Sequence, residues 1–341
     1  MQDDLRNILI LFTGGTIASV KTETGLRPVL DASQILSFLP DLGAHIALDS
    51  LQVCNLDSTN MTCEIWLKLA AAIERSYEKY DGFVICHGTD TMAYTAAALS
   101  YLIQNPDKPI VLTGSQQPIQ MEITDAKKNL FDSILYAADR ESCGITVIFD
   151  GRVIAGTRAK KIRSSSYQAF SSINFPELAS MRHGKIVRYL PGKEKAGDQR
   201  SETIFYRKLN PRVFALKMIP GMNSGILGAV FAQYDCIVVE SFGVGGIPDS
   251  VLDDFSRLME GYEDGEKIIV MTTQVTYEGS SLSTYEVGKR IRERFSYLEA
   301  YDMNFEAAVA KMMWIMGLGR LSFPEIEALF YSKINYDVLL S

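Results

Sequence analysis

The feature that most limits how this chain can fold is an alternation between short apolar runs and longer segments with helical periodicity. Such alternation is typical of βαβ units, in which buried parallel strands are joined by crossover helices. In the first half of the chain, the predicted strands are Ile8–Phe12, His45–Leu51, Phe83–Cys86, Pro109–Leu112 and Ile145–Phe149. The sequence therefore predicts an α/β fold on a parallel sheet, of the flavodoxin-like or Rossmann-like kind.

Two segments between these runs have the periodicity of buried helices. Residues 64–80 place apolar side chains four positions apart, at Ile65, Leu69 and Ile73, which predicts a helix with one buried face. The nearly apolar segment TAAALSYLI, from Thr95, predicts a helix that is buried on all sides.

Residues 189–212 form a charged stretch of weak periodicity that contains two prolines and two glycines. Beyond it, strands are predicted at Val213–Ile219, Cys236–Glu240 and Ile268–Met271, and a helix from about Phe305 to Met316. The 341 residues are enough for two domains, because one domain typically holds roughly 100–200. We predict an N-terminal α/β domain over 1–188, a linker over 189–212 and a smaller C-terminal α/β domain over 213–341.

The charge and hydropathy patterns exclude several classes of protein. The net charge of −7 leaves no basic excess to neutralise phosphates, so we expect no nucleic-acid partner. The N-terminal sequence MQDDLRNIL is acidic and lacks the apolar core of a secretory signal. No window approaches the roughly 18 apolar residues of a membrane span. We therefore expect a cytoplasmic protein without membrane association.

The cysteine and histidine content argues against disulfides and metal sites. The five cysteines have no C-x-x-C spacing, and their odd number suits reduced thiols. The three histidines, His45, His87 and His183, lie far apart and form no metal-ligand pattern. We expect neither a metal nor a cofactor.

Three predicted strands end in related turns: LFTGGT at 11–16, ICHGTD at 85–90 and VLTGSQ at 111–116. Thr-Gly after a strand is common turn chemistry, so one such turn alone indicates little. The carboxyl ends of parallel strands, however, meet at one edge of the sheet, where ligands bind. The sequence therefore predicts that Thr16, Thr89, Asp90 and Ser115 contribute to a single pocket.

A phosphate or dinucleotide site is the first alternative for these glycine-rich turns. The segment TGGTIAS fits neither G-x-G-x-x-G nor G-x-x-x-x-G-K-[ST]. Two threonines and an acid favour acyl chemistry on a small polar substrate instead.

The segments TGGTI at 13–17 and HGTDTMAYTA at 87–96 resemble the bacterial-type L-asparaginase family, most of all its cytoplasmic type I branch. The resemblance spans nearly the whole chain. Further similar segments are LDSTNMT at 56–62, PIVLTGSQQPI at 109–119, AGTRAKK at 155–161, SFGVG at 241–245 and YDMNFEAAVAKM at 301–312.

The resemblance implies a catalytic role for four residues near the predicted turns. Thr16 matches the family's nucleophile, and Thr89, Asp90 and Lys161 match a second group in which a lysine activates a threonine or the hydrolytic water. A threonine hydroxyl needs a neighbouring base, and a lysine serves as one only when neutral. Without the resemblance Lys161 would be assigned to the surface, because it belongs to the basic run AKKIR.

The resemblance also implies a substrate-binding set. Asp57 and Ser58 match residues that hold the α-amino and α-carboxylate groups, and the backbone of Ser115 matches a contact to the side-chain amide. Gly15 and Thr59 complete the set. Asp57 has an alternative interpretation as the cap of a following helix.

The function implied is hydrolysis of L-asparagine to L-aspartate and ammonia through a β-aspartyl ester. Backbone N–H groups of the glycine turns would stabilise the oxyanion. The family forms intimate dimers, usually within tetramers, so we expect a homodimer or homotetramer. Three alternatives stay open: a glutaminase-asparaginase of mixed specificity, the ammonia-supplying subunit of a tRNA amidotransferase, and a non-catalytic amino-acid sensor. The amidotransferase chains carry an extra N-terminal domain, whereas Thr13 follows only a dozen residues here.

The chain departs from the family at two places. Where members often carry a tyrosine in the loop after the nucleophile, this chain has Leu26. We expect Tyr285, from the C-terminal domain of a neighbouring subunit, to supply that hydroxyl, with Tyr277 as the alternative. The second departure is Ala126 in place of a glycine, for which we expect a small change in the loop.

His87, which precedes the turn at 88–90, invites assignment as a general base. We favour a structural role, because the end of the strand would place it beneath the turn.

Overall fold

The computed structural model describes residues 5–22, 25–192, 202–282, 290 and 293–339. Contacts divide the chain into two compact units, Met1–Arg207 and Lys208–Ser341. The predicted linker over 189–212 and the domain limits around it stay predictions. None of the helices among the described residues is long and apolar enough to cross a bilayer.

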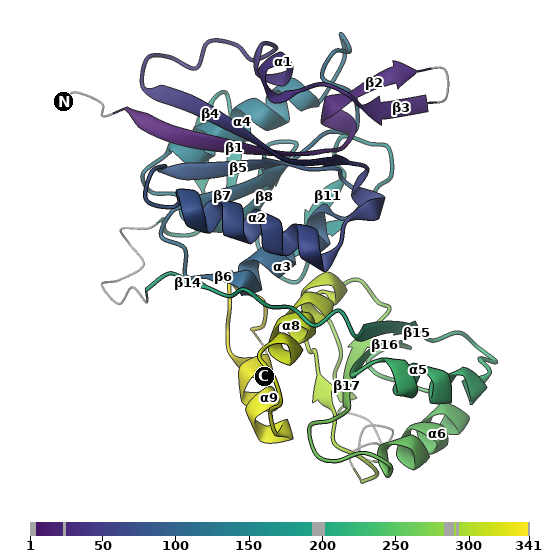
Figure 1. Ribbon diagram of the computed structural model, residues 1–341. Helices are drawn as coiled ribbons and strands as arrows, with labels where there is room; N and C mark the ends of the chain where they lie inside the picture. The colour runs from purple at the N-terminus through teal and green to yellow at the C-terminus, as the bar shows by residue number, and fades with distance from the viewer. Residues whose placement is uncertain (1–4, 23–24, 193–201, 283–289, 291–292, 340–341) are drawn as a thin grey trace. The chain divides into compact units, whose positions relative to one another are not determined.

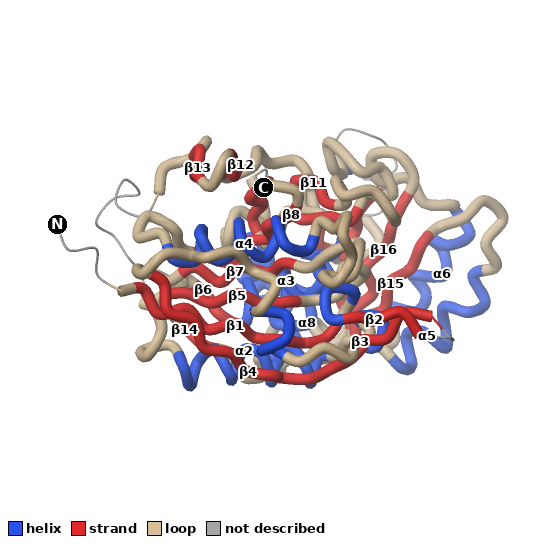
Figure 2. Tube along the Cα trace, turned by 90° about the horizontal axis from the view of Figure 1, so that it is seen from above, coloured by secondary structure: helices blue, strands red, loops and turns tan. Residues whose placement is uncertain are grey.

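The N-terminal unit is built on an eight-stranded sheet in the order β13-β12-β9-β8-β7-β5-β1-β4 (Figures 1 and 2). Its parallel strands are β1 (Arg6–Gly14), β4 (Ile46–Leu56), β5 (Gly82–Cys86), β7 (Pro109–Thr113) and β8 (Gly144–Phe149). Antiparallel strands extend the sheet beyond β8: β9 (Arg152–Ala155), β12 (Ala179–Arg182) and β13 (Lys185–Arg188). The five predicted strands are confirmed, and β4 is longer than predicted, since it continues to Leu56.

Numbered along the chain, the parallel strands lie in the order 2-1-3-4-5, the flavodoxin-like arrangement. The chain passes from β1 outward to β4 and then returns to β5 on the other side of β1. In such sheets, ligands bind at the carboxyl ends of the strands that flank this change of direction. The turns after β1 and β5 are therefore the place where a site is expected.

Helices cover both faces of this sheet (Figure 1). α1 (Ala32–Leu36) and α4 (Ala126–Ala138) share a core with Ile8, Ile10 and Phe12 of β1. The other face carries α2 (Cys63–Ser76) and α3 (Met92–Leu102). Buried residues occur on every side of α3, so this helix is enclosed on all sides, as the sequence predicts.

The helix predicted over 64–80 ends earlier, at Ser76. Tyr77 is nevertheless buried and stacks on Phe83 with ring centroids 5.9 Å apart. The apolar period therefore continues one residue beyond the helix, which explains why the predicted end lies too far along the chain.

The C-terminal unit has a four-stranded parallel sheet in the order β15-β16-β17-β18. Its strands are β15 (Val213–Lys217), β16 (Cys236–Ser241), β17 (Ile268–Thr273) and β18 (Leu298–Glu299). The helices are α5 (Leu227–Gln233), α6 (Asp249–Met259), α8 (Phe305–Gly317) and α9 (Phe323–Tyr331). The three strands and the helix that the sequence predicts in this region are confirmed.

The remaining short elements connect these layers. They are η1 (Thr16–Ala18), β2 (Ser19–Thr22), β3 (Gly25–Pro28), η2 (Ser58–Asn60), β6 (Ile103–Gln104), β10 (Ala159–Lys161), β11 (Phe170–Ser172), β14 (Ile204–Phe205) and η4 (Ser224–Ile226). β2 and β3 form a hairpin directly after η1, and β10 and β11 form a separate antiparallel pair.

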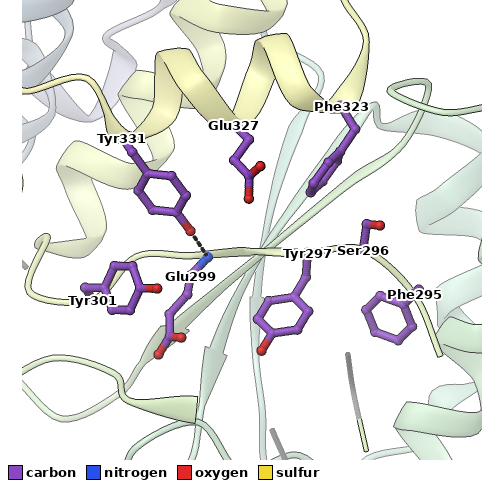
Figure 3. A pocket seen from close by; sticks show the side chains of 8 residues that line it. All are labelled: Phe295, Ser296, Tyr297, Glu299, Tyr301, Phe323, Glu327 and Tyr331. Carbon is purple, nitrogen blue, oxygen red and sulfur yellow. Dashed lines mark hydrogen bonds between the residues drawn. The ribbon is translucent and has the colours of Figure 1, made fainter. Parts of the chain in front are cut away.

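A cavity of about 390 Å³ lies between β18 and α9 in the C-terminal unit (Figure 3). Aromatic rings and two carboxylates, those of Glu299 and Glu327, line it. The backbone N–H of Glu299 donates to the Tyr331 hydroxyl over 3.0 Å, and the side-chain Oε1 of Glu299 accepts from the N–H of Leu282 over 2.7 Å. These bonds attach β18 to α9 and to Leu282.

A buried ion pair joins α8 to the chain that follows α9. The Lys311 ammonium donates to Asp337 Oδ2 over 2.6 Å and to the Ser332 carbonyl over 2.7 Å, and both charged side chains are 0% exposed. Burial lowers the pKa of Lys311, and the carboxylate of Asp337 opposes this effect. The ammonium therefore depends on Asp337 to remain charged at this position.

We expect Asp337→Asn to destabilise the C-terminal unit by about 3–5 kcal/mol, because it leaves a buried ammonium without its counter-charge. Urea unfolding followed by the emission of Trp314, in a Trp66→Phe background, measures the C-terminal unit alone. Glu260→Gln, the same chemical change at an exposed position of this unit, is the control and should leave the midpoint unchanged. Equal midpoints for the two variants would contradict the pair.

Candidate active site

The turns after β1 and β5 touch each other through their glycines. Gly15 has φ +80°, and a Cβ there would lie 2.5 Å from the backbone N and Cα of Gly88. No side chain fits between the two backbones. The residues that follow, Thr16 and Thr89, therefore belong to turns in direct contact.

Two further turns join this contact. A Cβ on Gly88 would lie 2.6 Å from the Ser58 Oγ, which brings in the segment after β4. A Cβ on Gly114 would lie 2.2 Å from the carbonyl oxygen of His87, which brings in the turn after β7. The structure thus brings four strand ends together at the place where the strand order changes direction.

Lys161 reaches this cluster from β10. Its ammonium donates to the Thr89 hydroxyl over 2.7 Å and to Asp90 Oδ1 over 2.6 Å. The Lys161 side chain is 16% exposed and that of Asp90 58%, whereas Thr89 is buried. Of the two lysines in AKKIR, it is Lys161 that contacts the predicted threonine and aspartate.

Thr16 is half-buried at the start of η1, and only Gly15 separates η1 from the end of β1. The chain can turn this sharply because both Gly14 and Gly15 have positive φ, +103° and +80°. The Thr16 hydroxyl is therefore presented by a short helix at the carboxyl edge of the sheet.

Asp57 and its neighbours form η2 at the end of β4. Asp57 Oδ1 accepts from the N–H of Thr59 over 2.9 Å and from its hydroxyl over 3.0 Å. Asp57 therefore caps η2, whereas α2 begins only after Thr62. Ser58 is buried, and its carbonyl accepts from the Thr91 hydroxyl over 2.8 Å. Asp57 and Thr59 are exposed, so a ligand can reach both.

The turn after β7 is held by its own side chains and by α4. The buried Ser115 hydroxyl donates to the Gln117 carbonyl over 2.6 Å, so the predicted contact to a ligand is left to the Ser115 backbone. The Asp125 carboxylate accepts from the backbone N–H groups of Gln116 and Gln117.

Ala126 is the first residue of α4 and does not need a positive φ. Its N–H donates to the Thr124 hydroxyl over 3.0 Å, and that hydroxyl donates to the Gln117 carbonyl over 3.2 Å. An alanine at this position is therefore compatible with the local structure.

His87 is fully buried under the turn, and both ring nitrogens have partners. Nδ1 lies 2.6 Å from the Gly88 carbonyl, and Nε2 lies 2.9 Å from the Thr95 hydroxyl. The oxygen of that hydroxyl accepts from Trp66 Nε1 over 2.8 Å. Burial lowers the pKa of His87 to about 4. A neutral ring with the proton on Nδ1 satisfies every partner, which supports a structural role.

Gln116 is a polar residue at this site that the sequence analysis did not select. Its Oε1 accepts from the Thr89 hydroxyl over 3.3 Å, and its Nε2 donates to the Ser166 carbonyl over 3.2 Å. A glutamine neither titrates nor attacks a substrate. Gln116 is identified as part of the site only by its position beside Thr89, and the sequence does not show that position.

Two predicted residues cannot be placed. Tyr285 lies outside the described residues, and so does the side chain of Leu26, of which only the backbone is described, in β3. Tyr277, the alternative, is described and is 51% exposed. Across the described part of the chain, no group of three or more His, Cys, Asp or Glu side chains could hold a metal ion.

Comparison with known proteins gives matches over both units. Residues 7–192 match the family model "Asparaginase, N-terminal", and residues 212–330 match "Glutaminase/Asparaginase C-terminal domain". The chain is 40% identical over 338 residues to the L-asparaginase of Thermococcus kodakarensis. The aligned residues cover 97% of this chain and 98% of that protein. It is 34% identical over 334 residues to a component of the glutamyl-tRNA(Gln) amidotransferase of Methanosphaera stadtmanae, covering 93% of this chain and 73% of that protein.

A solved structure agrees with these matches. The thermostable L-asparaginase from Thermococcus kodakarensis superposes with a TM-score of 0.89 at 37% identity, covering 98% of this chain and all of that one. With both of its units matched in this way, the chain belongs to the asparaginase family.

Proposed function

We propose that this protein hydrolyses L-asparagine to L-aspartate and ammonia. The observation that carries the proposal is the Lys161–Thr89 hydrogen bond of 2.7 Å beside the Gly15–Gly88 contact, because an amine and two hydroxyl-bearing turns then lie together. Amide hydrolysis needs these parts: a nucleophile, a group that moves protons and donors for the oxyanion.

Thr16 is the proposed nucleophile. Its hydroxyl oxygen attacks the side-chain amide carbon, the C–N bond breaks, and ammonia leaves with the proton taken from the hydroxyl. Backbone N–H groups of the touching glycine turns stabilise the oxyanion, where one good donor is worth about 3 kcal/mol. The product of this step is a β-aspartyl ester on Thr16.

Thr89, Asp90 and Lys161 form the proposed second group. Water attacks the ester carbon, its proton passes to Thr89, and the Thr89 proton passes to a neutral Lys161. The ester C–O bond then breaks, the Thr16 oxygen takes up the proton held by Lys161, and L-aspartate leaves after its acid proton is lost to solvent. The carboxylate of Asp90, 2.6 Å from the ammonium, holds Lys161 in place in its charged form.

The proposed substrate-binding set is Gly15, Asp57, Ser58, Thr59 and Ser115. The exposed Asp57 carboxylate suits the α-ammonium group of an amino acid by charge. The Ser58 hydroxyl suits its α-carboxylate, and the backbone of Ser115 suits the side-chain amide. The Thr59 hydroxyl, which donates to Asp57 Oδ1, orients that carboxylate. The tight contact of Ser58 with Gly88 supports this set, because Ser58 then lies against the residue that precedes Thr89.

The location and the assembly remain part of the proposal. We propose a cytoplasmic homodimer or homotetramer in which Tyr285 of a neighbouring subunit donates a hydroxyl near Thr16. A structure described as a probable cytoplasmic L-asparaginase from Campylobacter jejuni, 26% identical with a TM-score of 0.79, supports the location.

A second candidate function is supply of ammonia to a tRNA amidotransferase, which the similarity to the Methanosphaera stadtmanae protein favours. Both functions use the same hydrolysis, so they differ in whether a partner protein is needed. Turnover by the purified chain alone supports the hydrolase. A separate choice, between asparagine and glutamine, depends on one methylene, which is typically worth about 1–3 kcal/mol.

The purified chain should release ammonia from L-asparagine, and Thr16→Val should reduce the rate by about a thousandfold or more, because it removes only the attacking oxygen. Ammonia release and mass spectrometry of acid-quenched enzyme measure the turnover and the aspartyl adduct. Thr13→Val, the same change three residues earlier in β1, should retain the adduct. An aspartyl adduct on Thr16→Val would refute the assignment of the nucleophile.

Lys161→Met should lower kcat by about 10²–10⁴-fold with little change in KM, because it removes a proton carrier and leaves the substrate contacts in place. Steady-state kinetics on L-asparagine test this. Lys160→Met is the matched control, since adjacent side chains of a strand point to opposite faces. If Lys160→Met lost more activity than Lys161→Met, the assignment would be wrong.

Gly88→Ala should reduce kcat/KM by about a hundredfold, since a Cβ 2.6 Å from Ser58 Oγ forces the two turns apart and a shift of about 1 Å suffices for such a loss. The same assay measures it. Gly228→Ala, at a helical position of α5 with no atom within 4 Å of the added Cβ, is the control and should retain parental kinetics. An active Gly88→Ala enzyme would show that the contact is not needed.

A further inference from the structure

The hydrogen bonds around Gln116 have only one consistent direction. Its Nε2 lies 3.2 Å from the Ser166 carbonyl oxygen, which can only accept a hydrogen bond. The amide nitrogen must therefore face Ser166. The amide oxygen, Oε1, then faces the Thr89 hydroxyl over 3.3 Å.

The direction at Thr89 follows from that at Gln116. An amide oxygen can only accept, so the Thr89 hydroxyl donates its single proton to Gln116 Oε1. Towards Lys161 the hydroxyl oxygen presents only lone pairs, and Lys161 Nζ donates to it over 2.7 Å. The chain of donors therefore runs from Lys161 through Thr89 to Gln116.

Gln116 is held in place by α4. Its backbone N–H donates to both oxygens of the Asp125 carboxylate, over 3.1 and 2.9 Å, and the N–H of Gln117 donates to Asp125 Oδ1 over 3.0 Å. Asn129 Nδ2 bonds both Asp125 and the Gly114 carbonyl. Asp125 and Asn129 are 6% and 1% exposed, so this support is not open to solvent.

We propose that Gln116 is a positioning residue, which turns the Thr89 hydroxyl away from Lys161 and so stabilises the arrangement in which Lys161 carries the proton. This inference rests on the proposed function, in which the Thr89 proton must pass to a neutral Lys161. Gln116 Oε1 and Lys161 Nζ then compete for one proton. The outcome depends on whether Lys161 is charged.

The described charged groups that face these three side chains are Asp90 on the Lys161 ammonium and Asp125 behind the Gln116 backbone. Two further cations belong to the same segment as Lys161. Arg163 donates to the Gln168 carbonyl over 2.8 Å, and Lys160 lies on the opposite face of β10 from Lys161. All of them remain in the variants below. A difference between parent and variant therefore reports on position 116.

The test is the pH profile of kcat in Gln116→Met, which has nearly the same length but neither donates nor accepts. Gln116 Oε1 accepts the Thr89 proton only while Lys161 is charged, so losing this acceptor destabilises the charged form of Lys161. The acid-side midpoint of the kcat profile should therefore move to lower pH, by about 0.5–1 unit. Gln116→Glu, whose carboxylate accepts more strongly, should move the midpoint to higher pH. Gln117→Met, at the next residue, should leave it unchanged.

A second measurement does not depend on activity. Acetic anhydride reacts only with neutral amines, so the pH at which the Lys161 peptide becomes half-labelled, read by mass spectrometry, should move in the same two directions. Thermal melting identifies variants that fail to fold.

The inference is overturned if Gln116→Met lowers kcat but keeps the parental midpoint, or if the methionine and glutamate variants move it in the same direction. A parent that releases no ammonia from L-asparagine would refute the proposed function instead, and labelling of Lys161 would still decide the role of Gln116.

Discussion

The site depends on one steric constraint, the contact between the backbones of Gly15 and Gly88. A single added carbon at either position would overlap the other turn or Ser58. The glycines lie at the ends of β1 and β5, the strands between which the order of the sheet changes direction. The flavodoxin-like topology brings the two strand ends together, and the missing side chains let the turns that carry Thr16 and Thr89 touch. Every proposed role for these threonines assumes this approach.

The lysine reaches the site by a different route. Lys161 lies on β10, which pairs only with β11 and is not part of the parallel sheet. An ammonium brought to a buried hydroxyl needs partners, and Thr89 and Asp90 supply them. The partly exposed Asp90 keeps the charge near water, in contrast to the fully buried pair of Lys311 and Asp337 in the C-terminal unit. Asp90 suits the proposed role of Lys161 as a proton carrier, whereas the buried pair suits a fixed structural link.

Much of the fold was predictable because it depends on periodicity. The parallel strands and the buried helix α3 follow from apolar runs, and the turn glycines follow from their place at strand ends. The pairing of β9 with β12 and the role of Gln116 were not predictable, because they arise from contacts between residues distant in sequence. Lys161 was selected by family resemblance, since its basic run gives no sign of a partner at position 89. Asp57 caps η2 with one oxygen, as one of its two interpretations predicts, and it is exposed, so its proposed role in substrate binding stays a prediction.

Threonine, rather than serine, suits a hydroxyl that must serve two partners in turn. The β-branched side chain restricts χ1, so the oxygen stays fixed while only its proton rotates. At Thr89 the oxygen lies within bonding distance of both Lys161 Nζ and Gln116 Oε1, and its burial leaves little room for another rotamer. Moving the proton between the two acceptors then needs no movement of heavy atoms. In the proposed reaction, the direction of one O–H bond separates the resting arrangement from the one in which Lys161 accepts a proton.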